Sequence, residues 1–257
     1  MSRIQKMKAM RTGTARGGNM KIFLVRIGAD QSKGGGEWNG PVNLPTEEFA
    51  YVPIPEDSEA YQIHPGFEKP YTNIIPTLNR FNLALPEHLY GLNMHLDPDF
   101  SYLTYGDQGK KADQFKNTEQ GDWIVFYAGL KDIGEGHKLV YALIGLFVVE
   151  SWEFAVQIPE EDRDINAHTR RKLKQDAQDI VIRAQKEKSG RLKRCIPIGS
   201  YYDRAYRVNP EILKEWGGLS VKNGYIHRSA RIPNVCDPVG FREWWNRQKP
   251  VLIHENN

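Results

Sequence analysis

The sequence is poor in cysteine and contains no long apolar run. Its two cysteines, Cys195 and Cys236, form no CxxC pair, which fits a reducing compartment and argues against a disulfide framework or a zinc ribbon. The longest apolar stretch, residues 139–149, is too short to cross a bilayer, so we expect no transmembrane helix. Residues 1–19 are basic but have no apolar core, so they do not form a secretory signal. These absences predict a cytoplasmic protein.

Recognisable cofactor motifs are also missing. The seven histidines follow no HExxH-type spacing, so the sequence predicts neither a catalytic metal nor a cofactor. The glycine-rich segment 34–40 lacks the Lys-Ser/Thr ending of a P-loop, which argues against binding of a nucleoside triphosphate. The formal net charge of +3 is too small to indicate a polyanionic partner by itself. The distribution of the charges is therefore more informative than their sum.

Apolar patterning predicts a mixed fold. Strands are expected at residues 20–27 and 49–56, and a β-hairpin is expected from 121–130 and 139–150 around a glycine-rich turn. Helices are expected at 110–117, at 166–190 with Asn166 as its cap and Gly190 at its end, and at 238–248.

Together these elements indicate one α+β (mixed α/β) domain over residues 20–257. Its N-terminal and middle part is β-rich, and its C-terminal third is basic and more helical. Residues 1–19 are expected to be a flexible basic extension, and the only candidate for an internal boundary lies near 155–165.

Three stretches carry a resemblance to a known family. They are MKIFLVRIGAD…GGG…NGPV…FAYVPIPE at the start, HLDPDF at 95–100, and YGDQGKKADQFKNTEQGDWIVFYAGL at 105–130 with the hairpin strand that follows. In this order, over roughly residues 20–150, they resemble the nucleotide-modification-associated domain family, third type. The resemblance implies a domain found beside DNA base-modification and phage-defence genes. It also implies the activity of an antiphage DNA glycosylase that removes glucosylated hydroxymethylcytosine, with modified, double-stranded phage DNA as the partner.

Acidic residues near 95–100 suit this chemistry. Cleaving a base from deoxyribose moves positive charge onto the sugar, so an enzyme needs a carboxylate near C1′. Asp97 and Asp99 are candidates, and His95 beside them can orient water or donate a proton. Asp30, at the exit of the first strand, is a further candidate. The alternative is that the aspartates only stabilise turns and that His95 is structural.

An extruded nucleotide also needs aromatic walls and polar contacts, and DNA needs cationic partners. The alternatives are that the glycine-rich loop with Trp38 is a mobile surface loop and that at least one of the tyrosines packs in the core. Acids interleaved with the cations leave a solvated helix face as the alternative to DNA contact. The residues expected to bind the substrate are Arg26, Trp38, Asn39, Tyr102, Tyr105 and Gln108. The residues expected to bind DNA are Arg170, Arg171, Lys172, Lys174, Arg191, Lys193, Arg194, Arg228 and Arg231.

Three functions remain open from the sequence. The first is a DNA glycosylase that flips out and excises a bulky modified base and leaves an abasic site in antiviral defence. The second is a reader of modified bases without turnover, for which the hairpin would be suitable. The third is a base-hypermodification enzyme, although the sequence shows no fingerprint for binding a group donor.

Overall fold

The computed structural model describes residues 20–134, 136–227 and 232–257. The predicted extension at 1–19 and two predicted DNA contacts, Arg228 and Arg231, lie outside this part of the chain. A ten-stranded sheet forms the centre of the molecule, and β4 and β5 form a separate two-stranded sheet. The strands are β1 (Ile22–Arg26), β2 (Pro41–Asn43), β3 (Glu48–Phe49), β4 (Ile54–Pro55), β5 (Met94–His95), β6 (Thr104–Asp107), β7 (Trp123–Asp132), β8 (Leu139–Phe154), β9 (Ile180–Ala184), β10 (Gly190–Tyr202), β11 (Ala205–Val208) and β12 (Leu252–Ile253).

The predicted hairpin is confirmed as β7 and β8. The two strands pair antiparallel from Trp123 opposite Val148 to Lys131 opposite Leu139. Their β-branched and aromatic side chains favour strands, and most of them are buried. Phe126 and Phe147 pack edge to face at 4.9 Å, which places the hydrophobic core on this hairpin.

The predicted first strand is also confirmed, as β1. β1 pairs in parallel with β7, with Arg26 opposite Tyr127. The chain leaves β1 through Gly28, which has a φ of 81°, a conformation that glycine adopts without strain. The predicted strand at 49–56 is interrupted, since only β3 and β4 form within it.

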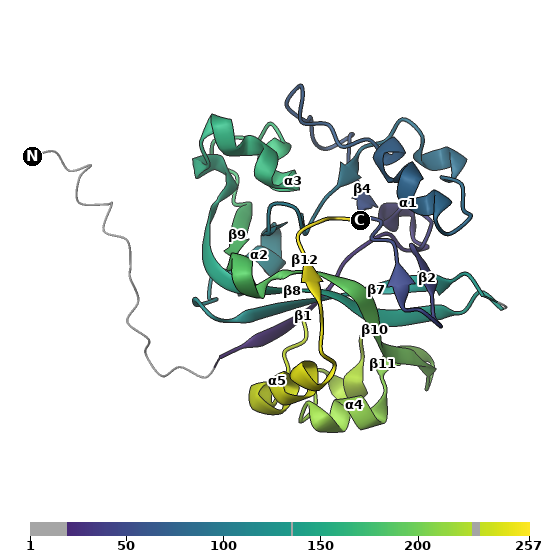
Figure 1. Cartoon of the computed structure of the whole chain (residues 1–257). Coiled ribbons are helices and arrows are strands. Elements are labelled where there is room, and N and C mark those ends of the chain that lie inside the picture. The colour runs from purple at the N-terminus through teal and green to yellow at the C-terminus, as the bar shows by residue number, and fades with distance from the viewer. Residues whose placement is uncertain (1–19, 135, 228–231) are drawn as a thin grey trace, which may run out of the picture.

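Short helices cover the sheet on two sides. Figure 1 shows α1 (Ile75–Asn79) and α3 (Ala167–Arg170) above the sheet, and α4 (Pro210–Glu215) and α5 (Pro238–Arg247) below it. The predicted helices at 110–117 and 238–248 are confirmed as α2 (Gly109–Phe115) and α5. Trp244 and Trp245 of α5 are 3% exposed and belong to the core.

The predicted long helix at 166–190 is wrong. Asn166 does cap a helix, with a complete capping box, but this helix is the four-residue α3. Residues 180–184 instead form β9, which pairs with both β6 and β8. The β-branched residues Ile180, Val181 and Ile182 are fully buried there, and burial between two strands outweighs the helical propensity of the surrounding polar residues.

The predicted α+β class is nevertheless confirmed, since a large mixed sheet is combined with several short helices. In the described part of the chain, none of the helices is long and apolar enough to cross a bilayer.

Candidate functional site

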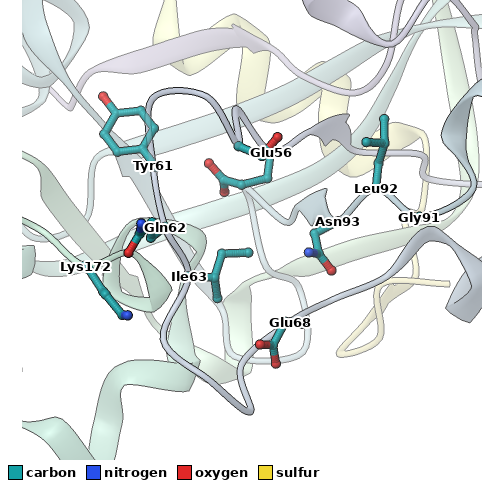
Figure 2. Close-up of a pocket in the computed structure, with 10 residues that line it drawn as sticks. Glu56, Tyr61, Gln62, Ile63, Glu68, Gly91, Leu92, Asn93 and Lys172 are labelled. Carbon is teal, nitrogen blue, oxygen red and sulfur yellow. The ribbon is translucent and has the colours of Figure 1, made fainter.

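A cleft of about 1010 Å³ opens between the loop after β1, residues 54–61, β5, β6 and α3. A smaller hollow of about 370 Å³ adjoins it and shares part of its wall, including Glu56 and Tyr61. Figure 2 shows this hollow, with Glu56 and Tyr61 on its wall and Lys172 contributed by the segment after α3. Residues far apart in sequence therefore meet at one concave surface.

The two-stranded sheet positions the first histidine of the cleft. His95 in β5 pairs with Ile54 in β4, which brings Glu56 beside the imidazole. Nδ1 of His95 lies 2.8 Å from Oε2 of Glu56. An ionised carboxylate can only accept, so this nitrogen carries the ring proton. Nε2 of His95 then faces Oδ2 of Asp97 at 3.9 Å.

A second histidine approaches the same oxygen of Asp97. His168 lies in α3, and its Nδ1 is 2.6 Å from Oδ1 of Asp179. Its Nε2 is 3.6 Å from Oδ2 of Asp97. Gly106 in β6 permits this approach, because a Cβ there would collide with the His168 ring and with Oδ1 of Asn166. The His95 and His168 rings consequently lie 5.1 Å apart, edge to face.

Asp97 itself is held firmly at the floor of the cleft. Its Oδ1 accepts hydrogen bonds from the backbone N–H of Gly106 at 2.5 Å and from Nδ2 of Asn166 at 3.2 Å. Its side chain is 7% exposed. The cap of α3 therefore also fixes Asp97, and the second carboxylate oxygen is left facing the two histidines.

The surroundings shift the pKa values of these groups in different directions. Burial disfavours the imidazolium of His168, but the Asp179 hydrogen bond and the Asp97 carboxylate outweigh it and raise its pKa to about 9. Burial lowers the pKa of His95, even though Glu56 opposes this shift. Burial would raise the pKa of Glu56, but His95 and Arg171 outweigh it and lower that pKa to about 2. Glu56 is therefore an ionised partner that orients His95.

A further carboxylate, Asp107, lines the cleft and was not predicted from the sequence. It accepts hydrogen bonds from the hydroxyl of Tyr105 at 2.6 Å and from the N–H of Gln108 at 2.8 Å. Burial raises its pKa, although Lys111 and the Tyr105 hydrogen bond oppose this shift. Its position between two predicted substrate contacts, Tyr105 and Gln108, was the signal available in the sequence.

Six of the predicted substrate and catalytic residues do meet in this cleft: Arg26, Asp30, His95, Asp97, Tyr105 and Gln108. Arg26 and Asp30 form an ion pair at 3.3 Å. Asp30 also accepts a hydrogen bond from the N–H of Ser32 at 2.8 Å, so it stabilises the turn as well as lining the cleft.

Asp99 requires a correction. Its side chain is 1% exposed and lies 2.6 Å from Nη2 of Arg170, and Asn256 donates to its other oxygen at 3.0 Å. It lies outside the cleft lining, so it has no access to a sugar. Asp99 is a buried structural carboxylate.

Three predicted substrate contacts also lie outside the cleft lining. Asn39 is 2% exposed and donates to the carbonyl of Gly129 at 2.8 Å, so it holds two segments of the fold together. Trp38 packs partly buried against the core. Tyr102 is exposed and donates to Oδ2 of Asp164 at 2.8 Å.

The predicted basic surface is divided by the fold. Arg170, Arg171 and Arg191 are buried, so the expectation that they contact phosphates is corrected. Arg170 and Arg171 face internal carboxylates because α3 and β9 replace the predicted long helix, and Arg191 donates to the carbonyl of Glu255. The exposed members of the predicted set are Lys172, Lys174, Lys193 and Arg194.

A cleft with a fixed carboxylate, two histidines and shifted pKa values is typical of an enzyme or of a selective binding protein. The family described as nucleotide modification associated domain 3 matches residues 21–248, and the chain belongs to that family. The match includes the basic region beyond residue 165, where the sequence resemblance did not reach. Neither the curated proteins nor the solved structures contain a match to the chain. Family membership is consistent with a role in DNA base modification and with a nucleic acid as the partner.

Proposed function

We propose that this protein hydrolyses the N-glycosidic bond of a bulky modified base in DNA, of the glucosylated hydroxymethylcytosine kind, and acts against phage DNA in the cytoplasm. The observation that carries the proposal is the carboxylate of Asp97, held rigidly at the floor of a cleft that also contains Asp107. Paired carboxylates are the usual means of hydrolysing glycosidic bonds, since one stabilises the sugar cation or orients water and the other donates a proton.

The size of the cleft supports a bulky substrate. A volume of about 1010 Å³ lies at the upper end of the range for small-molecule sites, which leaves room for an extruded nucleotide whose base carries a sugar. Tyr61 lines the same cleft, and the ring face that Arg171 does not cover can receive a base. An unmodified nucleotide would fill it less well.

The reaction can be assigned to particular groups. Water adds to C1′, the bond from C1′ to the base nitrogen breaks, and the electron pair leaves with the base. Asp97 stabilises the developing positive charge on the sugar or orients the water, and it accepts the proton that the water loses. Asp107 supplies the proton to the departing base, because burial keeps this carboxyl protonated to a higher pH than an ordinary aspartate.

Contact with DNA phosphates must come from the rim of the cleft. The lining itself contains six carboxylates and four lysine or arginine side chains, so its floor does not favour phosphates. Lys33 and Lys111 belong to the lining and Lys172 to the adjoining hollow, and we assign the phosphate contacts to them.

An aromatic cluster near Arg26 offers a surface for unpaired bases. Arg26 lies over the ring of Tyr141, whose ring packs against Tyr206 at 4.4 Å. Tyr206 in turn contacts Tyr201, which is 61% exposed. Stacking on exposed aromatic rings is tolerant of sequence, which suits an enzyme that selects its target by the modified base.

The test uses purified protein and duplex DNA with a single glucosylated hydroxymethylcytosine, with an unmodified duplex as the control. We expect release of the modified base, detected by mass spectrometry, and strand breakage at that position after alkali. Intact modified DNA that is bound tightly would instead identify a reader. Activity that required a sugar nucleotide or another group donor would identify a hypermodification enzyme.

A further inference from the structure

Three metal-ligating atoms converge at the floor of the cleft: Nε2 of His95, Oδ2 of Asp97 and Nε2 of His168. All three lie within 4.8 Å of one another. The separations of 3.9 and 3.6 Å between the carboxylate oxygen and the two nitrogens are too long for hydrogen bonds. They are close to the spacing of about 3.4 Å that ligands adopt around a tetrahedral zinc ion with bonds near 2.1 Å. The two carboxylate–nitrogen separations would shorten by a few tenths of an ångström, and the two Nε2 atoms, which lie within 4.8 Å of each other, would draw together around the ion.

The neighbours of the two histidines orient the rings as metal ligands. Nδ1 of His95 is held by Glu56 at 2.8 Å, and Nδ1 of His168 by Asp179 at 2.6 Å. Histidine ligands usually donate this second nitrogen to a carboxylate, which orients the ring and makes the other nitrogen more basic. The His95–Glu56 and His168–Asp179 pairs both direct an Nε2 atom at Asp97, as expected of histidine ligands that are oriented by carboxylates.

The buried charges around the cluster are also unbalanced. Glu56, Asp97 and Asp179 bring three carboxylates, and Arg171 is the guanidinium that contacts both Glu56, at 2.6 Å, and Asp179, at 3.9 Å. Arg171 lies on the Nδ1 side of His95, away from Asp97. Even with His168 as the imidazolium, the three carboxylates exceed the two cations by one charge, and they exceed Arg171 alone by two when both histidines are neutral; such an excess in a buried place is costly unless a cation compensates it.

We propose that His95, Asp97 and His168 bind a divalent first-row transition metal ion, of the class of Zn²⁺, Mn²⁺ or Fe²⁺. Two imidazoles with one carboxylate suit these ions, whereas Ca²⁺ and Mg²⁺ prefer sites built from oxygen ligands. Because the protein supplies three ligands, one or more coordination positions remain for water or substrate on the cleft side.

The inference goes beyond the proposed glycosylase function and changes the route by which Asp97 acts. A metal ion lowers the pKa of bound water and so supplies a hydroxide at neutral pH. Asp97 would then hold the ion that carries the attacking water instead of contacting the sugar. The ligands lie on β5, the loop after it and α3, so no local sequence motif announces them.

The direct test is a titration of full-length protein that has been treated with EDTA and dialysed. Co²⁺ is added and followed by its visible absorption bands, and Zn²⁺ is followed by calorimetry, with Mg²⁺ as a negative control. We expect one equivalent of Co²⁺ or Zn²⁺ per chain, competition between the two ions, and no heat with Mg²⁺. The titration contains no DNA, so its result is independent of whether the cleft cleaves N-glycosidic bonds.

Variants identify the ligands. His168→Ala and Asp97→Asn should each raise the dissociation constant for Co²⁺ by about 100-fold or more. Asp179→Asn, which keeps all three ligands but changes a supporting carboxylate, should raise it by about 10- to 100-fold. His137→Asn removes an exposed histidine of the β7–β8 turn and should bind as the unaltered protein does.

Absence of Co²⁺ bands and of Zn²⁺ heat in the unaltered protein would overturn the proposal and leave the His168 imidazolium as the cationic partner of Asp97. Binding of Co²⁺ by His168→Ala and Asp97→Asn as tight as that of the unaltered protein would also overturn it, because the ion would then lie elsewhere. Loss of binding in His137→Asn would overturn it for the same reason. The measurement on the unaltered protein does not depend on the folding of any variant.

Discussion

At the scale of single residues, Asp97 and Asp99 are two positions apart but lie in opposite environments. Asp97 faces the cleft and two histidines, while Asp99 is enclosed and paired with Arg170. Both residues flank Pro98 in the sequence, so the local pattern predicts the same role for them. The structure predicts different effects of replacing them. Loss of Asp99 should lower the stability of the fold, and loss of Asp97 should lower the rate of the proposed reaction.

Replacing Asp99 with alanine should lower the free energy of unfolding by about 1–3 kcal/mol, because the buried Arg170 loses one of its two carboxylate partners and keeps only Asp164. The measurement is urea denaturation followed by tryptophan fluorescence. The control is Asp113→Ala, which removes an exposed partner of Lys116 and should cost about 0–1 kcal/mol. Equal stability of the two variants would show that the Asp99–Arg170 pair is not structural.

Asp107 gives a prediction for the pH profile. Its pKa is raised, so its acid form is present at pH values below the raised pKa and is lost as the pH increases through it. The single-turnover rate of base release should therefore fall on the alkaline side of that pKa. Asp107→Asn should lower the rate by about 10²- to 10⁴-fold and remove this limb. An alkaline limb that persists in Asp107→Asn would assign the proton donor to another group.

At the scale of secondary-structure elements, the sequence is informative wherever the pattern is local. β1, the β7–β8 hairpin, α2, α5 and the Asn166 cap could all be predicted from apolar periodicity and capping residues. β9 could not, because its pairing with β6 and β8 outweighs the helix-favouring residues around it. The same limit applies to the site. His95 and Asp97 are neighbours and were found, whereas His168 and Asp179 reach them only through the fold.

β6 carries the glycine on which the contact between α3 and the cleft depends. Gly106→Ala would push a Cβ into the His168 ring and Asn166, so we expect a loss of about 1–3 kcal/mol in stability and a displaced His168. Gly129→Ala in β7 is the matched control, since its Cβ would meet Asn39 at an ordinary 3.5 Å. Thermal unfolding of both variants, with the rate of base release measured alongside, provides the comparison. Unchanged stability and activity in Gly106→Ala would contradict the close packing.

At the scale of the whole molecule, the last residues of the chain connect the core to the region around the site. Asn256 accepts from the N–H of Phe100 at 2.8 Å, and Asn257 bonds both backbone groups of Tyr51 at 2.8 Å. Figure 1 shows the C-terminus returning past β12 towards β4 and α1. The cleft is therefore supported by segments from the beginning, the middle and the end of the chain.

The distribution of cations predicts which face of the molecule contacts DNA. Lys111 lies in the cleft and Lys172 in the adjoining hollow. Lys111→Ala and Lys172→Ala should each weaken DNA binding and reduce the slope of log K against log salt concentration by about one. Lys214→Ala in α4, on the other side of the sheet, is the control and should leave the slope unchanged. Fluorescence anisotropy at several salt concentrations measures these slopes. A larger effect from Lys214 would place the DNA on the opposite face.

The most direct measurement compares the unaltered protein with Asp97→Asn, on duplex DNA that contains glucosylated hydroxymethylcytosine. Single-turnover base release and DNA affinity are determined on the same samples. We predict that the release rate falls by at least about 100-fold while the affinity changes by less than about threefold, because the asparagine keeps the shape but not the charge. Base release at the original rate by Asp97→Asn, or no release by the unaltered protein, would contradict the account.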